Sequence, residues 1–113
     1  MVGGTNTSQL LSGRVEVSIA PDNWGTICDD HFDNTDAAVI CKMLGYQRGR
    51  KRSRGAFARG TGAIFMDDVH CLGNEESIFA CPYNGWGHHD CDHDEDAMVE
   101  CSSDGGKYHV FTL

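Results

Sequence analysis

Six cysteines constrain this chain more than any other feature of its sequence. Their number is even, and the last four follow at intervals of ten residues: Cys28, Cys41, Cys71, Cys81, Cys91 and Cys101. No pair has the C-x-x-C spacing typical of structural zinc sites or thioredoxin-like redox motifs. In a small domain this pattern favours disulfides formed in an oxidising compartment over metal ligands or free thiols. The spacing leaves the pairing open, because six cysteines allow many connectivities.

The length and composition suit one small domain. The chain has 113 residues, enough for a single domain with a modest core. Its 40% hydrophobic and 23% charged residues argue against disorder along the whole chain. No signal peptide or apolar run of membrane-spanning length is visible, so we expect a piece of a larger secreted or membrane-anchored protein. Asn6-Thr7-Ser8 is a candidate glycosylation sequon at Asn6.

The hydrophobic pattern predicts a β-hairpin near the start and one main helix. Residues 14–19 alternate as in a half-buried strand, with three core-facing side chains: Val15, Val17 and Ile19. Residues 24–28 form the second strand, after a turn at 21–23. Asn34 or Thr35 can cap a helix that begins near Asp36 and ends at Gly45. The remaining expected elements are an exposed loop (47–62), a buried strand (63–66), helical turns (75–80) and a closing strand (97–101).

Long ordered motifs run through nearly the whole chain. They are GRVEV (13–17), WGTICDD (24–30), AAVICKMLGY (37–46), GAIFMDDVHC (62–71), GWG (85–87) and the segment from Cys91 to Cys101. In this order they resemble a scavenger receptor cysteine-rich (SRCR) domain, from about Val2 onward. An eight-cysteine form of the family would carry cysteines at the positions of Leu11 and Tyr46, so the resemblance is to the six-cysteine form, group A.

The resemblance implies the fold and the disulfide pairing. The fold is a compact α+β structure with long loops, in which a curved antiparallel β-sheet cradles one main α-helix. The implied bridges are Cys28–Cys91, Cys41–Cys101 and Cys71–Cys81. We expect an N-terminal edge segment (1–13), the domain core (14–101) and a C-terminal tail (102–113). The tail is either disordered or pairs with a sheet edge of its own chain or of a neighbour, which would give a dimer.

Acidic residues outnumber basic ones by 17 to 9 and gather in short groups. Carboxylates held close repel one another unless a cation neutralises them, and calcium accepts oxygen ligands from separate loops. The resemblance implies one cation site at Asp29, Asp30 and Glu95, and a second at Asp67, Asp68, Glu75 and Asp90. We expect weakly bound calcium, with magnesium as the other candidate ion; otherwise the acids only cap turns and solvate the surface. Three histidines nearby are either structural or ligands for zinc or copper: His88, His89 and His93.

Basic residues concentrate in one short segment. Six of the nine lie between positions 48 and 59: Arg48, Arg50, Lys51, Arg52, Arg54 and Arg59. This segment has a charge of +6. Because the net charge of the whole chain is −8, the rest of the chain carries −14. Arginine forks suit carboxylate, sulfate and phosphate groups. The segment therefore indicates polyanion binding, as in scavenger-type relatives; the alternatives are a solvated loop and a surface for one acidic protein.

These features predict an extracellular binding module, secreted or in the ectodomain of a membrane protein. We expect calcium-assisted recognition of polyanions such as modified lipoproteins, sulfated glycans and microbial surface polymers, with nucleic acid bound only as a non-specific polyanion. The alternative is an accessory module with a dedicated protein partner. No nucleophile elbow, P-loop or His-Glu-x-x-His motif occurs, so we expect no enzyme activity and no membrane insertion.

Overall fold

Three disulfides join the six cysteines in the computed structural model, which describes residues 9–85 and 91–103. They are Cys28–Cys91, Cys41–Cys101 and Cys71–Cys81. The pairing implied by the family resemblance is confirmed. The first two bridges span 63 and 60 residues, and the chain-entropy model gives each about 4 kcal/mol of stabilisation. Asn6, Trp86, His88, His89 and Asp90 lie outside the described residues, as does the tail beyond Ser103.

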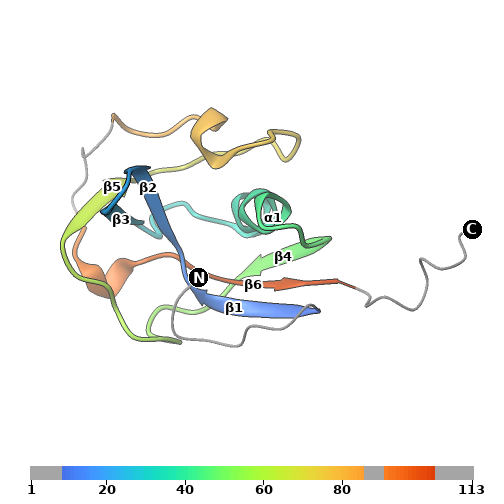
Figure 1. Ribbon diagram of the computed structural model, residues 1–113, viewed down its shortest axis with the longest axis horizontal. Helices are drawn as coiled ribbons and strands as arrows, with labels where there is room; N and C mark the ends of the chain where they lie inside the picture. Colours follow the sequence, from blue (N-terminus) through green and yellow to red (C-terminus); the bar gives the residue numbers. More distant parts are fainter. Residues whose placement is uncertain (1–8, 86–90, 104–113) are drawn as a thin grey trace, which may run out of the picture.

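The α+β class is confirmed. The strands form two three-stranded sheets instead of the single curved sheet that was expected (Figure 1). The first sheet is antiparallel and has the order β1 (Leu10–Arg14), β6 (Met98–Ser102), β4 (Arg48–Lys51). The second has the order β2 (Glu16–Ala20), β3 (Asn23–Ile27), β5 (Ala63–Met66). Strands β2 and β3 form the expected antiparallel hairpin, whereas β3 and β5 run parallel.

The alternating segment at 14–19 divides between these two sheets. Arg14 ends β1, Glu16 begins β2, and the backbone N–H of Val15 between them donates to the Ala97 carbonyl at 3.0 Å. Val15 and Val17 are buried as expected. At the hairpin turn Asp22 takes a φ of 62°, a left-handed conformation that aspartate tolerates better than most residues.

Helix α1 (Asn34–Met43) begins earlier than expected, because Asp33 is its N-cap. The Asp33 side chain accepts the backbone N–H groups of Thr35 and Asp36, at 3.0 and 3.1 Å. The Asp36 side chain accepts the Asp33 N–H in return, which completes a capping box built from two aspartates. The expected cap at Asn34 or Thr35 is therefore wrong by one or two positions. The second Asp36 oxygen accepts the Cys71 N–H at 2.6 Å, and burial raises the pKa of this carboxyl.

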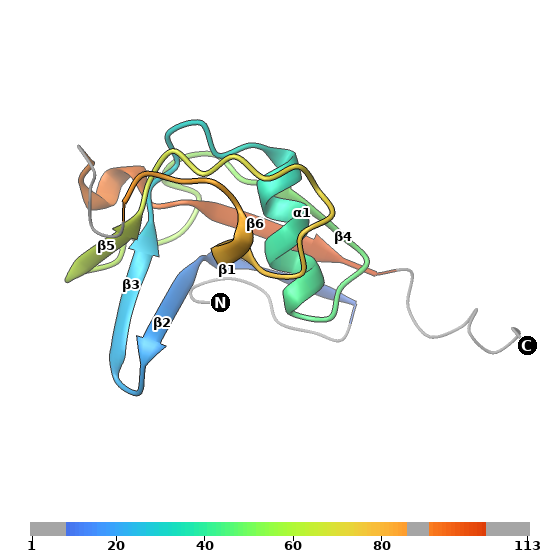
Figure 2. The ribbon, with the colours of Figure 1, turned by 90° about the horizontal axis from the view of Figure 1, so that it is seen from above.

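The segment expected to be a loop at 47–62 contains strand β4. Its sequence, Arg-Gly-Arg-Lys, has no apolar residue, and its side chains are largely exposed at the border of the sheet. Backbone pairing with β6 and packing against α1 therefore form this strand without a hydrophobic face (Figure 2). The helical turn expected at 75–80 is a short 3-10 helix, η1 (Ile78–Ala80).

The hydrophobic core lies between α1 and the two sheets. Its fully buried side chains include Ile27, Val39, Met66, Val69, Ile78 and Val99. Leu11 belongs to this cluster, and the partly buried Tyr46 packs against it; these are the positions where the resemblance places the extra bridge of the eight-cysteine form. Trp24 is 55% exposed and Phe79 41%, so they are not core residues, in contrast to Phe65. Within residues 9–85 and 91–103, no helix has the length and apolar character needed to cross a membrane.

Candidate functional site

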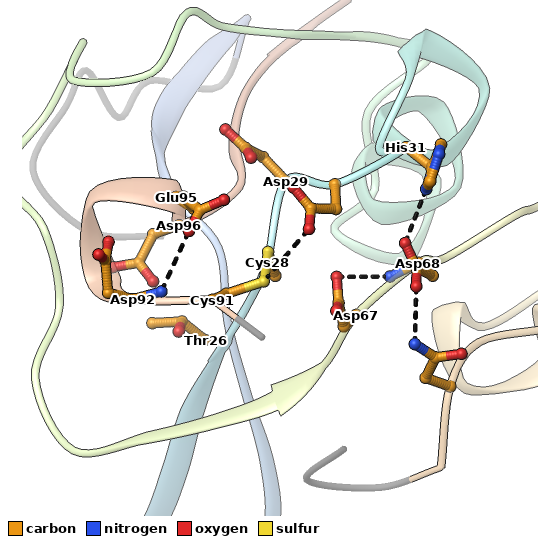
Figure 3. Close-up of a disulfide and its surroundings, with 12 residues drawn as sticks. Thr26, Cys28, Asp29, His31, Asp67, Asp68, Cys91, Asp92, Glu95 and Asp96 are labelled. Carbon is orange, nitrogen blue, oxygen red and sulfur yellow. Dashed lines mark hydrogen bonds and ion pairs between the residues drawn. A yellow bond between two sulfur atoms is a disulfide. The ribbon is translucent and has the colours of Figure 1, made fainter. Parts of the chain in front are cut away.

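The Cys28–Cys91 bridge joins the acidic turn after β3 to the acidic segment before β6. The Asp29 N–H donates to the Glu95 carbonyl at 2.7 Å, and the Ala97 N–H donates to the Ile27 carbonyl at 2.6 Å. Glu95 ends a short 3-10 helix, η2 (His93–Glu95), whose capping residue is Asp92. Two acidic segments more than sixty residues apart are thus held side by side (Figure 3).

Asp30 lies at the centre of a group that we call the carboxylate cluster: Asp30, Asp67, Asp68 and Glu95. An oxygen of Asp30 lies within 4.8 Å of oxygens of Asp67 and Asp68, and the Asp30 and Glu95 carboxylates also approach within that distance. Asp67 is almost fully buried. The adjacent sulfurs of Cys28 and Cys91 are bonded to each other and are not thiolate ligands. The donors that remain are carboxylate oxygens, which suit a hard cation such as calcium.

Asp29 points to a basic side chain instead of to the cluster. Arg54 Nε and Nη2 donate to the two Asp29 carboxylate oxygens at 3.0 and 2.8 Å. The same Nη2 lies 3.5 Å from Glu95 Oε2. The hydrogen bond to Asp29, with the charges of Asp29, Glu95 and Asp30, raises the pKa of Arg54 above its ordinary value. This guanidinium is therefore a cation already placed against two of the three residues expected in the first cation site.

The second expected site is brought together only in part. Asp67 and Asp68 meet Asp30, whereas the structure places Glu75 beside the Cys71–Cys81 bridge. Both Glu75 oxygens accept backbone N–H groups of its own turn, at 2.8 and 2.9 Å. The bond from the Leu72 N–H is the main reason that the pKa of Glu75 is lowered. In the described residues, Asp30 lies close both to Glu95 of the first expected site and to Asp67 and Asp68 of the second.

Asp68 also accepts two side-chain hydrogen bonds at the outer side of the cluster. His31 Nδ1 lies 2.7 Å from one Asp68 oxygen, and Asn84 Nδ2 donates to the other at 2.7 Å. The bond to His31 lowers the pKa of Asp68 and correspondingly raises the pKa of His31. Both residues have left-handed backbone conformations, with φ values of 61° for His31 and 53° for Asp68.

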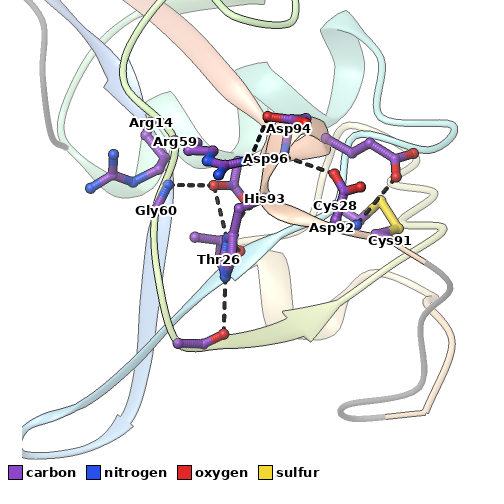
Figure 4. Close-up of polar contacts among 12 residues, drawn as sticks. Arg14, Thr26, Cys28, Arg59, Gly60, Cys91, Asp92, His93, Asp94 and Asp96 are labelled. Carbon is purple, nitrogen blue, oxygen red and sulfur yellow. Dashed lines mark hydrogen bonds and ion pairs between the residues drawn. A yellow bond between two sulfur atoms is a disulfide. The ribbon is translucent and has the colours of Figure 1, made fainter.

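His93 connects η2 to the loop before β5 and has a structural role (Figure 4). Its Nδ1 lies 2.9 Å from the buried Asp96 carboxylate, and its Nε2 lies 2.9 Å from the Gly62 carbonyl oxygen. Burial lowers the pKa of His93, but these two hydrogen bonds outweigh it and raise the pKa. Asp96 also accepts the Gly60 N–H at 2.7 Å. Sequence reasoning considered His93 for metal binding and missed Asp96; the His-x-x-Asp spacing was the available signal.

Four basic side chains of the 48–59 segment pair with carboxylates. Arg50 contacts Glu100 at 2.6 Å, Arg52 approaches the same residue at 3.6 Å, and Arg59 contacts Asp94 at 2.9 Å. Arg54 pairs with Asp29, as described above. The Arg52 guanidinium also lies 5.4 Å from the ring centroid of Phe57, which is half-buried. Surface pairs of this kind contribute little to stability.

A pocket of about 280 Å³ opens where the basic segment meets the acidic turn. It is lined by Asp29, Phe32, Lys51, Arg52, Ser53, Arg54 and Met98. The end of β4 supplies Lys51, and the turn that follows it supplies the two arginines. The basic surface and the first expected cation site therefore share one wall, formed by Asp29 and Arg54.

The chain matches known proteins along nearly all of its length. The model of the scavenger receptor cysteine-rich domain matches residues 3–102. The macrophage receptor MARCO of Mus musculus is 51% identical over 102 residues, which cover 90% of this chain and 18% of that receptor. MARCO of Mesocricetus auratus is 50% identical over 101 residues, 89% of this chain and 19% of the receptor. The chain thus spans about a fifth of these relatives.

Solved structures agree in fold. The dimeric form of the SRCR domain of mouse MARCO superposes with a TM-score of 0.77 at 48% identity, covering 88% of this chain and 94% of that domain. The third SRCR domain of murine neurotrypsin gives a TM-score of 0.76 at 45% identity, covering 89% and 92% of the two chains. With a family match over residues 3–102 and relatives about 50% identical, the chain belongs to the scavenger receptor cysteine-rich family.

Proposed function

We propose that this domain is an extracellular ligand-binding module that captures polyanions at its basic segment, with help from a divalent cation. The observation that carries the proposal is the shared pocket, where Lys51, Arg52 and Arg54 face Asp29. Arginine and lysine side chains on a turn can each contact a sulfate, phosphate or carboxylate group of a repeating polymer. The similarity to a macrophage receptor supports this class of function.

The cation contributes by changing the charge next to the basic segment. The carboxylate cluster and Asp29 place five acids within one small region, and a divalent ion there neutralises two charges. Asp30 and Glu95 would hold the ion, joined by Asp29 once it parts from Arg54, and Asp67 and Asp68 lie within reach of Asp30. We expect a dissociation constant for calcium on the order of 0.1–1 mM, as in other extracellular modules.

Polyanion binding is tested with immobilised dextran sulfate across a salt series, with calcium or chelator. The change is the quadruple variant Arg50→Ala, Lys51→Ala, Arg52→Ala, Arg54→Ala. It should bind at least tenfold more weakly and show a flatter dependence on salt, because fewer counterions are released. Replacement of Lys42 on the helix by alanine is the control. Unchanged binding of the quadruple variant would place the polyanion site elsewhere.

The cation site is tested separately by thermal unfolding. At about 10 mM calcium, a ligand with the expected affinity stabilises the folded state by roughly 1.4–2.7 kcal/mol relative to chelator. An Asp30→Asn, Asp67→Asn variant should lose this difference. Identical melting curves of the wild-type protein in calcium and in chelator would contradict the cation site.

A dedicated protein partner is the second candidate function, and the exposed apolar side chains favour it. Leu72 is 84% exposed, and Met43 and Leu44 border a small groove beside β2. A second copy of the chain is one such partner, because a related SRCR domain is known in a dimeric form. Absence of any dextran sulfate binding would favour this candidate. Light scattering of the purified domain would report whether it dimerises.

A further inference from the structure

Arg54 occupies the carboxylates that a cation would use. Its guanidinium donates to both oxygens of Asp29 and lies 3.5 Å from Glu95, so one side chain spans two acids of the expected cation site. By contrast, Arg59 contacts Asp94, an acid of the same η2 turn that lies outside the carboxylate cluster. Arg54 is thus placed as a counter-ion within the protein.

A divalent ion and the Arg54 guanidinium compete for these oxygens. Both are positive, both are attracted by the same carboxylates, and each repels the other at short range. The binding of one therefore weakens the binding of the other, and by linkage the effect is equal in both directions. Arg54 can leave, because its side chain is 55% exposed and the adjacent Gly55, with a φ of 80°, has open space around it.

A guanidinium that leaves Asp29 stays at the mouth of the basic pocket. Arg54 lines this pocket together with Lys51 and Arg52. While Arg54 pairs with Asp29, the two charges cancel and the pocket offers an incoming anion little from this residue. Once a divalent ion neutralises Asp29, the same arginine can donate to an anionic group in the pocket.

We propose that Arg54 is an exchangeable counter-ion: a divalent cation displaces it from Asp29 and Glu95, and the released guanidinium then binds a sulfate or carboxylate group of the polyanion. Cation binding and polyanion binding are thereby coupled through one side chain. This inference rests on the proposed function, because it needs both ligands to bind in the same region. Beyond that function, it assigns to Arg54 the role of opposing cation binding, and it explains how a bound cation would strengthen polyanion binding.

The test is an Arg54→Gln variant, titrated with calcium chloride by calorimetry and with dextran sulfate by surface binding. Calcium affinity should rise at least fivefold, because the competing cation is gone. The enhancement of polyanion binding by calcium should be lost. Thermal melts verify that the variant folds, which its exposed position favours.

The matched control is Arg59→Gln, which removes the same charge from an arginine near the same turn without touching Asp29 or Glu95. It should change calcium affinity less than twofold. Calcium affinity that is unchanged or weaker in Arg54→Gln, or raised equally in Arg59→Gln, would overturn the counter-ion role while leaving the proposed function intact. If neither wild type nor Arg54→Gln binds calcium, the inference and the cation part of the proposed function both fall. Binding by Arg54→Gln alone would support the inference and refute cation assistance in the native protein.

Discussion

Gly49 lies where strand β4 crosses closely over helix α1, and a single methyl group there should destabilise the domain. A Cβ atom at this position would collide with Cys41 Sγ, and would lie 2.7 Å from the Ala37 carbonyl oxygen and 2.8 Å from Cys41 Cβ. Gly49 also pairs with Cys101 across the sheet, and the disulfide of Cys101 with Cys41 links the sheet to the helix. A Gly49→Ala substitution therefore forces strand and helix apart.

The magnitude follows from how little these neighbours can move. Ordinary contacts of a Cβ atom begin at 3.4 Å, so the overlap is about 0.7 Å against the helix backbone and larger against the disulfide sulfur. Overpacking of a core costs typically 1–3 kcal/mol, and this rigid environment points to about 3 kcal/mol. Lower chain entropy of alanine in the unfolded state offsets about 0.5–1 kcal/mol. The net loss is about 2 kcal/mol, or roughly 10 °C in melting temperature.

Thermal and urea unfolding of the oxidised protein measure this loss. The control is Ser53→Ala, an exposed position in the same segment, which should stay within about 0.5 kcal/mol of wild type. Since Gly49 has no left-handed φ, backbone strain contributes nothing to the comparison. A Gly49→Ala protein that melts within a degree or two of wild type would refute the close crossing of β4 over α1.

Three further perturbations test other parts of the fold. Asp36→Asn should lower the unfolding free energy by about 2–3 kcal/mol in urea, since an amide cannot accept both backbone N–H groups that the carboxylate accepts; an effect no larger than that of Asp22→Asn would count against it. The double variant Cys71→Ala, Cys81→Ala opens a bridge that spans ten residues, so it should lose only about 3 kcal/mol and remain folded at 25 °C; an unfolded product by circular dichroism would contradict this. Glu75 has a lowered pKa, so its stabilisation relative to Glu75→Gln should be full above pH 4.5 and disappear as the pH falls below it; a difference independent of pH would exclude the two backbone hydrogen bonds.

The helix and the hairpin were predictable because their apolar residues recur with a regular period. Ala37, Ile40 and Cys41 mark one face of a helix, and all three are buried. Strand β4 was not predictable in this way, because its residues are charged or glycine and its stability comes from neighbouring elements. The disulfide pairing came from the family resemblance, since spacing alone cannot distinguish among the connectivities.

The candidate site was predictable in its residues but only partly in its geometry. Asp29 and Asp30 are adjacent in the sequence and look equivalent there. The chain turns directly after Asp29, whose carbonyl accepts the Phe32 N–H at 3.0 Å, and the two neighbouring side chains make different contacts. Asp30 faces Asp67 and Asp68, while Asp29 faces Arg54. Pairing of the basic segment with acids could not be predicted either, because it depends on which loops the fold places together.

Strand β6 gives this domain an order of assembly during biosynthesis. Among the described strands it is the last to be synthesised, yet it hydrogen-bonds to both β1 and β4 and carries Cys101, the partner of the helical Cys41. The first sheet cannot form from the residues translated earlier, since its central strand is missing until about residue 102 has emerged. The first sheet thus forms only after β6 has been synthesised, and a truncation before Met98 would leave two border strands with nothing between them.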